Sequence, residues 1–449
     1  MSYEKSIQKS QELARLVSSG GGRAYYVGGF VRDRLLGKEN KDIDIEVHGI
    51  TPEKLEKILD SLGKRIEFGK SFGVYGLTGY NIDIAMPRKE ILTGSGHRDF
   101  KIDIDPFIGT EKAAMRRDFN VNAIMQDILT GELIDHFSGE RDLRAGVLRH
   151  VNDKAFGEDP LRVLRGAQLA ARFNFTIAPE TVELCKKTDL NSLSGERVFD
   201  ELKKALLKAE APSLFFENLR LMNQLSVWFC EVERLIGVPQ HSVYHKEGDV
   251  WTHTMLALDE AAKRRNYVSR PLYFMLSARV HDFGKITATK FIKGEYHAYS
   301  HENEGLPLVK KFLQRITNEK ELHSYVVNMT MLHMKPNTLA RDNSSVKATN
   351  KMFDSAKCPE DLILLSECDA NGKIPRNPYH ETAEFLKERL MIYRKYMSRP
   401  YVTGKDLIQM GIKPGEKFSE LLSYAHKLRL AGIEKKDVLS QIEIILKID

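Results

Sequence analysis

The chain has 449 residues, of which 42% are hydrophobic and 29% charged, with a formal net charge of +6. These values exclude an intrinsically disordered chain, and no apolar run is long enough to cross a membrane. The length predicts about three domains, and the mild basicity permits a polyanionic partner. The four cysteines are scattered without a C-x-x-C pair. This usage predicts free thiols in a reducing compartment, so we expect a cytoplasmic protein.

The segment from Tyr25 to Val47 carries the strongest pattern. An amphipathic helix is predicted before it, and within it the sequence Asp42-Ile43-Asp44-Ile45 reads as a strand. Strand side chains alternate between faces, so Asp42 and Asp44 share one face while the isoleucines face a core. Two neighbouring carboxylates favour a bridging cation, and hard divalent ions prefer carboxylate oxygens. The pair therefore predicts a metal site.

A glycine pair and an arginine precede this strand. Gly28 and Gly29 allow the backbone to approach a ligand closely, and Arg32 offers a fork of donors that suits phosphate. A lone D-x-D or a glycine pair is usually a solvated strand or an ordinary turn. The combination of metal, phosphate and glycine signals within one unit indicates nucleotidyl transfer.

The next elements form a mixture of strands and helices. Thr51-Pro52-Glu53 has the composition of a helix start, and residues 80–85 alternate as a strand. Asp83 in that strand is a candidate third carboxylate, and a plain surface aspartate is an equally good interpretation. The glycine-containing segment from Arg88 to Asp105 predicts a solvated loop.

A helix is predicted from Gly157-Glu158-Asp159-Pro160, where acidic residues and proline occupy the first turn. Its polar residues recur every three or four positions and share one face. They are Glu158, Arg162, Arg165 and Arg172, with Leu169 between them. Periodicity alone favours a surface stripe of ion pairs.

Histidine and aspartate become prominent after residue 241. They are His253, His281-Asp282, His301, His333 and Asp369. One histidine on an apolar helix is usually a core residue, but imidazoles together with carboxylates suit a transition metal that activates water.

Three ordered motifs give the chain a resemblance to a known family. They are GGFVRDRLLG followed by DIDI, Arg116–Ala123 (RRDFNVNA) and Glu158–Arg165 (EDPLRVLR). They resemble the class II tRNA nucleotidyltransferases, which are CCA-adding enzymes, and the related bacterial poly(A) polymerases. The resemblance implies an α+β protein with a polymerase-β-like head followed by an all-α neck, an HD-type helical domain and a helical tail. The implied boundaries are 1–23 for an N-terminal helix, 24–150 for the head, 151–240 for the neck, 241–374 for the HD-type domain and 375–449 for the tail.

The resemblance also implies roles in nucleotide addition to tRNA from CTP and ATP. Asp42 and Asp44 are the expected catalytic ligands of Mg²⁺, and Asp159 and Arg162 are expected to read the base edge, with Glu158 orienting the arginine. The implied nucleotide-binding residues are Gly28, Gly29, Arg32, Arg117, Asp118, Asn122, Asp159, Arg162 and Arg165. The sequence departs from the family at Gln168, where an arginine that holds phosphate is usual. Arg172 is a candidate substitute.

Three further expectations come from the resemblance. The loop within 88–105 corresponds to one that helps relatives switch from C to A, and its full length favours terminal A addition. The order of His and Asp residues resembles the HD phosphohydrolases, with His253, His281, Asp282 and Asp369 as primary ligands of a divalent transition metal. His301 and His333 are candidates for a second metal or for phosphate. Basic residues of the tail are candidates for tRNA contact or simple solvated faces.

Other functions fit the same patterns. An enzyme that adds only A and a poly(A) polymerase share the chemistry. From other classes, the chain could be an HD phosphohydrolase with a regulatory nucleotide-binding head, or an RNA-binding scaffold with two inactive sites. No pattern in the sequence specifies an oligomeric state.

Overall fold

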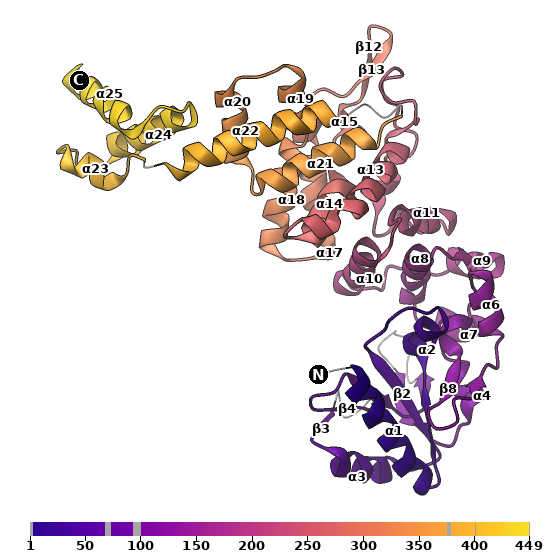
Figure 1. Ribbon diagram of the computed structural model, residues 1–449. Helices are drawn as coiled ribbons and strands as arrows, with labels where there is room; N and C mark the ends of the chain where they lie inside the picture. The colour runs from indigo at the N-terminus through magenta and orange to yellow at the C-terminus, as the bar shows by residue number, and fades with distance from the viewer. Residues whose placement is uncertain (1–2, 68–72, 93–99, 375–378, 400, 449) are drawn as a thin grey trace. The chain divides into compact units, whose positions relative to one another are not determined.

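The computed structural model describes residues 3–67, 73–92, 100–374, 379–399 and 401–448 (Figure 1). The chain divides into two compact units. The first comprises Met1–Ala205 and Leu214–Val227, and the second comprises Leu206–Ser213 and Trp228–Asp449. The expected α+β class is confirmed, with strands concentrated in the first unit and helices dominating the second.

A mixed seven-stranded sheet is the centre of the first unit. Its strands in spatial order are β3 (Arg65–Glu67), β4 (Val74–Leu77), β5 (Ile82–Ala85), β2 (Ile43–His48), β1 (Arg23–Tyr26), β8 (Met125–Asp127) and β9 (Leu133–Ile134). The pair β2–β5 is parallel, whereas the other pairs are antiparallel. Ile43 and Ile45 are each 1% exposed, so the predicted alternation of β2 is confirmed. Burial of these side chains fixes the register of β2, because a shift by one residue would expose them.

Three helices and a hairpin accompany the sheet. They are α1 (Tyr3–Ser19), α2 (Gly28–Leu35), α3 (Pro52–Leu62) and the pair β6 (Arg88–Leu92) with β7 (Phe100–Ile104). The Thr51 side chain caps α3, as the sequence predicted. The prediction of a loop throughout 88–105 is wrong at both ends, because the alternation of Phe100, Ile102 and Ile104 with polar residues supports a strand. The connection at 93–99, on which the expectation about A addition rests, lies outside the described residues.

Eight helices lie between residues 110 and 221, the first two of them before the strands β8 and β9. They are α4 (Thr110–Ala114), α5 (Asn120–Ala123), α6 (Gly139–Ala145), α7 (Asp153–Gly157), α8 (Leu161–Phe173), α9 (Pro179–Lys186), α10 (Gly195–Lys208) and α11 (Ser213–Leu221). The predicted helix after residue 157 is α8, and its first residue is Leu161. Asp159 accepts a hydrogen bond from the Leu161 amide, which satisfies a free donor at the helix start.

The second unit has a helical core. The helix α13 (Val250–Arg264) packs against α14 (Pro271–Val280) and α21 (Pro359–Asn371), and α14 also packs against α18 (Lys320–Leu332). A hairpin of β12 (Lys290–Ile292) and β13 (Glu295–His297) and the short helices α15 (Lys285–Ala288) and α16 (His301–Glu304) lie between α14 and α18 in the sequence. Buried histidine and aspartate residues that are distant in the sequence lie on or next to these elements.

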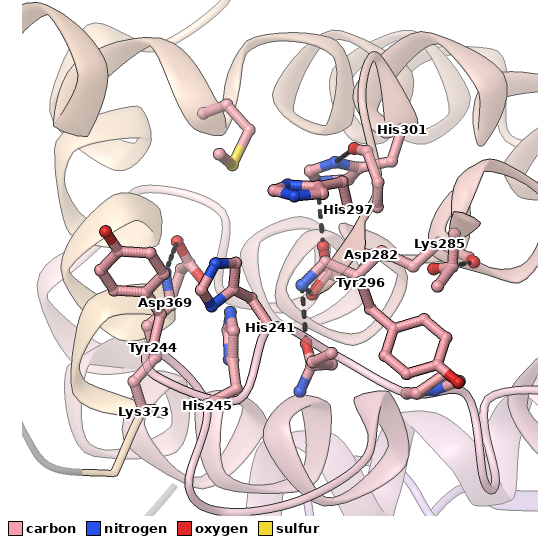
Figure 2. A pocket seen from close by; sticks show the side chains of 15 residues that line it. His241, Tyr244, His245, Asp282, Lys285, Tyr296, His297, His301, Asp369 and Lys373 are labelled. Atoms are coloured by element: carbon pink, nitrogen blue, oxygen red, sulfur yellow. Dashed lines mark hydrogen bonds and ion pairs between the residues drawn. The ribbon is translucent and has the colours of Figure 1, made fainter. Parts of the chain in front are cut away.

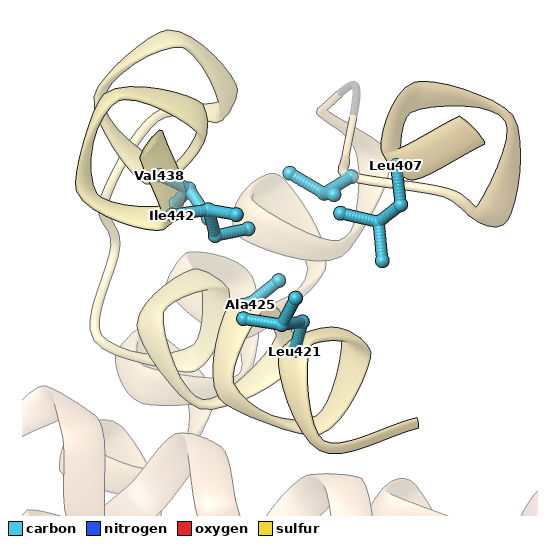
Figure 3. Close-up of a cluster of buried hydrophobic side chains, with 6 residues drawn as sticks. Leu407, Leu421, Ala425, Val438 and Ile442 are labelled. Atoms are coloured by element: carbon cyan, nitrogen blue, oxygen red, sulfur yellow. The ribbon is translucent and has the colours of Figure 1, made fainter. Parts of the chain in front are cut away.

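The C-terminal residues form a small helical cluster of their own. It contains α23 (Gly404–Gln409), α24 (Glu416–Leu430) and α25 (Lys435–Ile448), which follow the long helix α22 (His380–Ser398). Leu407, Leu421, Ala425, Val438 and Ile442 meet at its centre (Figure 3). Among the described residues, no helix combines the length and the apolar character that crossing a membrane requires.

Two candidate active sites

Three carboxylates converge at the start of β2. Asp44 on β2 stands opposite Asp83 on the parallel strand β5, and Asp42 immediately precedes β2. Asp42 and Asp83 are exposed, while Asp44 is partly buried. The structure therefore brings Asp83 next to the predicted metal pair, which favours the third-carboxylate interpretation over that of an isolated surface residue.

Asp44 is destabilised as an anion in this setting. Burial, together with the charges of Asp83 and Asp42, raises the pKa of Asp44 to about 6, although the nearby Arg117 opposes the rise. A divalent cation would remove this cost because it interacts with all the negative charges at once. The donor set of carboxylate oxygens fits Mg²⁺.

Gly28 brings the backbone against these acidic side chains. Its φ angle is +65°, and a Cβ atom there would lie 3.4 Å from Arg117 Nη1 and 3.5 Å from Asp44 Oδ2. Positive φ favours glycine, and a side chain would occupy the space between the carboxylate and the guanidinium. The glycine signal in the sequence thus corresponds to a close approach beside the carboxylates.

Arg32 is a buried part of the same region, with 4% of its surface exposed. Its Nε and Nη2 donate to Asp33 Oδ1, and its Nη1 donates to Asn122 Oδ1 at 2.6 Å. Burial lowers the pKa of Arg32, while the charge of Asp33 opposes this effect. Gly29 lies next to the guanidinium, since a Cβ atom there would be 3.4 Å from Nη2. Asp33 therefore fixes the predicted phosphate ligand, a role that the sequence reading missed.

Glu46 is a second residue that the sequence reading missed. It follows Asp44 by two positions, accepts a hydrogen bond from Arg117 Nη2 at 2.9 Å, and lies 2.9 Å from His48 Nε2. Burial alone would raise the pKa of Glu46, but the bonds with His48 and Arg117 more than offset it and lower the pKa. The period-two pattern of β2 was the available signal, because it places Glu46 on the face of Asp44.

The motif residues Asp118, Asn122 and Arg165 form one network. Arg165 donates to Asp118 Oδ2 through Nε at 2.8 Å, and its Nη2 lies 2.6 Å from the same oxygen. Asn122 donates to Asp118 Oδ1 at 2.9 Å. Burial would raise the pKa of Asp118, but the Arg165 charge and these bonds lower it. The network links the residues after α4 to the helix α8.

The other charged residues of α8 also contact the sheet region and its neighbours. Arg162 donates to the backbone carbonyls of Ala155 and Arg116, each at 2.7 Å, and Arg172 donates to Asp33 at 3.3 Å. Gln168 is 4% exposed, so the position that departs from the family lies in the interior. The stripe predicted from periodicity therefore holds α8 in place within the first unit.

A cluster of four histidines and two aspartates lies in the second unit. Its members are His253 on α13, His281 and Asp282 at the end of α14, His301 on α16, His333 after α18 and Asp369 on α21. Each is at most 5% exposed. The Nε2 atoms of His281, His301 and His333 lie 3.3, 3.2 and 3.8 Å from oxygens of Asp282, and His253 Nε2 lies 3.0 Å from Asp369 Oδ1. The structure thus brings together every predicted member of this second site.

The Nδ1 atoms of three of these histidines bind backbone carbonyls, so that their Nε2 atoms face the centre of the cluster. The Nδ1 atoms of His281, His301 and His333 lie 2.6–2.8 Å from carbonyl oxygens three residues earlier. A carbonyl oxygen only accepts, so each Nδ1 carries a proton, and in the neutral ring the lone pair that can bind a metal is then on Nε2. Burial, with nearby His281 and His301, lowers the pKa of His333 to about 3, so this imidazole is neutral.

Nε2 lone pairs and carboxylate oxygens that face one another repel, and a bound cation would remove this repulsion. His301 Nε2 lies 3.2 Å from His333 Nε2, and His281 Nε2 is buried with no hydrogen-bond partner in the described parts of the chain. Within this cluster, two groups of three residues have all their possible metal-ligand atoms within 4.8 Å of one another. They are His253 with His281 and Asp369, and Asp282 with His301 and His333. Imidazole and carboxylate donors in this arrangement fit a divalent transition metal.

Glu247 is the outer partner of the remaining histidine. Its side chain is fully buried, and its Oε1 lies 3.2 Å from His253 Nδ1 and 2.6 Å from His245 Nδ1. Burial opposes ionisation of Glu247, yet the bonds from His245, His253 and the Ile374 amide hold its pKa well below the usual range. Carboxylates in this position orient a metal-binding histidine. The sequence reading stopped at His253 and missed the H-K-E triplet just before α13.

The cluster opens into a cavity of about 380 Å³. Figure 2 shows Asp282, His301 and Asp369 among its lining residues, together with Lys285, Lys373 and several aromatic side chains. Lys285 Nζ lies 2.8 Å from Asp282 Oδ2, and Lys373 Nζ lies 3.4 Å from Asp369 Oδ2. Two ammonium groups beside a metal-type cluster suit an anionic substrate such as a phosphoester.

The sequence matches known families over much of the first unit. Residues 24–149 match the Poly A polymerase head domain, and residues 174–235 match the family described as the probable RNA and SrmB-binding site of polymerase A.

Similar proteins cover nearly the whole chain. A multifunctional CCA protein of Alkalilimnicola ehrlichii is 33% identical over 92% of this chain and 98% of its own length, and one of Nitrosococcus oceani is 35% identical over 89% and 95%. Among solved structures, a CCA-adding enzyme in its second apo form has a TM-score of 0.68 at 20% identity, covering 98% of this chain and 96% of its own. A Thermotoga maritima CCA-adding enzyme complexed with tRNA has a TM-score of 0.64 at 20% identity and covers 99% of both chains. The structural likeness extends the shared fold through the second unit, and the sequence identity shows that the chain belongs to the family of multifunctional CCA proteins.

Proposed function

We propose that the chain is a tRNA nucleotidyltransferase that adds C, C and A to the tRNA 3′ end, using CTP and ATP and releasing pyrophosphate. The observation that carries this proposal is the convergence of Asp42, Asp44 and Asp83 beside Gly28 and Arg117. Family membership supports the same activity, and a cytoplasmic location agrees with it.

The residues of the first unit would divide the work as follows. Asp42 and Asp44 would hold Mg²⁺, which when bound stabilises charge on the transferring phosphoryl group. Asp83, which lies opposite Asp44, would assist in metal binding. Arg32 and Arg117 are oriented by Asp33 and Glu46, so their remaining donors can hold triphosphate without first being ordered.

Selection of the base would be the task of the first turn of α8 and the residues just before it. We propose that Asp159 and Arg162 bind the edge of the incoming base, with Glu158 orienting Arg162 and Arg165 contributing to the binding of triphosphate. A short rigid helix is suited to this task because its side chains keep a fixed spacing. We also propose the domain boundaries expected from the sequence. The helical tail would contact tRNA.

A second activity is favoured by the cluster around Asp282. We propose that His253, His281, Asp282 and Asp369 hold a divalent transition metal and that His301 and His333 complete a neighbouring position. Such a metal polarises phosphoryl oxygens and activates water. Lys285 and Lys373 would hold the anionic substrate of a phosphatase or phosphodiesterase. The separate carboxylate site argues against the alternative of a phosphohydrolase with a merely regulatory head.

The nucleotidyl transfer is tested with three tRNA transcripts that end before CCA, after C and after CC. Each is incubated with the purified protein, Mg²⁺ and labelled CTP, ATP or both, and products are resolved at single-nucleotide length. Extension of all three to CCA followed by arrest is the expected result. Addition of one A only to the CC-ended transcript would identify an A-adding enzyme, and long A tails would identify a poly(A) polymerase. Absence of incorporation would contradict the proposal.

A further inference from the structure

Asp159, which lies just before the first residue of α8, is held by a neighbouring helix. Arg197 on α10 places its Nη2 atom 3.0 Å from Asp159 Oδ1 and 3.1 Å from Asp159 Oδ2. Glu201, one turn further along α10, lies 4.0 Å from Arg165 and is only 2% exposed. Residues four positions apart share a helix face, so one face of α10 contacts Asp159, which precedes α8, and Arg165 on α8.

The contacts of Asp159 fix its carboxylate. One Arg197 nitrogen bridges both oxygens, and Oδ1 also accepts the Leu161 amide at 3.1 Å. An ionised carboxylate has about four lone-pair sites. The Asp159 side chain is 37% exposed, so acceptor sites remain open to solvent on a group whose orientation is already set.

A fixed acceptor discriminates between bases by their exocyclic groups. Cytosine and adenine present amino donors at N4 and N6, whereas uracil and guanine present carbonyl acceptors at the corresponding positions. A carboxylate that cannot rotate away accepts from the first pair and opposes the second. Without its arginine, the carboxylate would have to be ordered when each nucleotide binds, which costs part of the discrimination.

We propose that Arg197 is the positioning residue that fixes Asp159 for the selection of bases carrying an exocyclic amino group. The inference rests on the proposed reading of bases by Asp159. Arg197 acts through Asp159 and not by contact with the base. No pattern in the sequence marked this arginine, because the contact joins residues 38 positions apart on different helices.

The test compares CTP with UTP on a transcript that ends before CCA, using kcat/KM for each nucleotide. Arg197→Met removes the charge at similar length, Arg197→Lys retains the charge on one donor nitrogen, and Lys203→Met changes an exposed residue of the same helix as a control. We expect Arg197→Met to lower the CTP/UTP ratio about 10-fold, Arg197→Lys to restore part of it and Lys203→Met to leave it unchanged. Melting temperatures of all variants identify any loss of folding.

A double-mutant cycle separates positioning from packing. In an Asp159→Asn background, Arg197→Met should have no further effect on the ratio, because the group it orients is gone. An equal loss for CTP and UTP, with the ratio unchanged, would show that Arg197 only packs α10 against α8 and would overturn the proposal. An unchanged ratio in Asp159→Asn alone would remove base reading by Asp159, and the assignment of Arg197 with it, while CCA addition by the wild type would still stand.

Discussion

The two candidate sites differ in exposure and in ligand type. Asp42, Asp44 and Asp83 meet at the start of two central, parallel strands, where two of the three are exposed, whereas the six members of the cluster around Asp282 are each at most 5% exposed. Oxygen ligands in an open site suit Mg²⁺, which keeps several waters and binds together with substrate phosphates. Buried imidazoles suit a transition metal that stays with the protein. Differences in burial and donor type would therefore let one chain hold an exchangeable metal at the first site and a permanent metal at the second.

The largest expected effect is on nucleotidyl transfer. Asp42→Ala removes a metal ligand, and we expect incorporation to fall about 1,000-fold or more, since the bound metal supplies several kcal/mol of charge stabilisation. Retained transition metal in the same variant would show that the second site is independent. Asp60→Asn, at an exposed position on α3, is the matched control. Transfer at the wild-type rate in Asp42→Ala would refute the metal assignment.

The reciprocal change concerns Asp282. Asp282→Asn removes the carboxylate that lies within 3.8 Å of the Nε2 atoms of His281, His301 and His333, so we expect loss of bound transition metal and of any phosphohydrolase activity. CCA addition should remain. Metal analysis of dialysed protein and primer extension on the same preparation measure both effects, with Asp342→Asn as an exposed control. Full metal content in Asp282→Asn would exclude this residue as a ligand.

A smaller effect is expected at Glu247. Glu247→Gln removes the negative charge that His253 and His245 share, and we expect metal affinity at the second site to fall about 10–100-fold. Competition with a chelator of known affinity gives the measurement. Glu304→Gln, exposed on α16, should leave the affinity unchanged. The same affinity in both variants would count against orientation of His253 by Glu247.

The smallest effect concerns stability without metal. The raised pKa of Asp44, about 6, means that its charged form is disfavoured in the folded state. The destabilisation is absent below pH 4, where Asp44 is protonated in both states, and is complete above pH 6. Asp44→Asn should therefore stabilise the metal-free protein at pH 8 by about 1–3 kcal/mol and have little effect at pH 4.

Denaturant unfolding in the presence of a chelator at both pH values tests this expectation. Added Mg²⁺ should stabilise the wild type more than Asp44→Asn, because the variant lacks the charge that the cation neutralises. A variant that is less stable than the wild type at pH 8 without metal would contradict the account.

Sequence patterns predicted the elements whose side chains alternate or repeat locally. The strand β2 that carries Asp44, the helix α3 and the helix α8 depend on periodicity and capping, which neighbouring residues encode. The histidines and aspartates of the second site were also found, because metal ligands are chemically distinctive. Partners that are not adjacent in the sequence but are in contact in the fold were missed. Glu46, Glu247 and Arg197 have ordinary residue types, and their roles arise only when the fold brings Arg117, His253 or Asp159 against them.

Metal content and transfer measured on one preparation test the central claim, that the chain holds two separate metal sites of different kinds. The protein is purified, dialysed against buffer without divalent ions, analysed for bound metal and then assayed for CCA addition with Mg²⁺ as the only added ion. The account predicts a stoichiometric transition metal retained through dialysis, lost in Asp282→Asn, and full transfer on addition of Mg²⁺ in both proteins. Transfer that requires the retained metal, or a metal content that Asp282→Asn leaves unchanged, would contradict it.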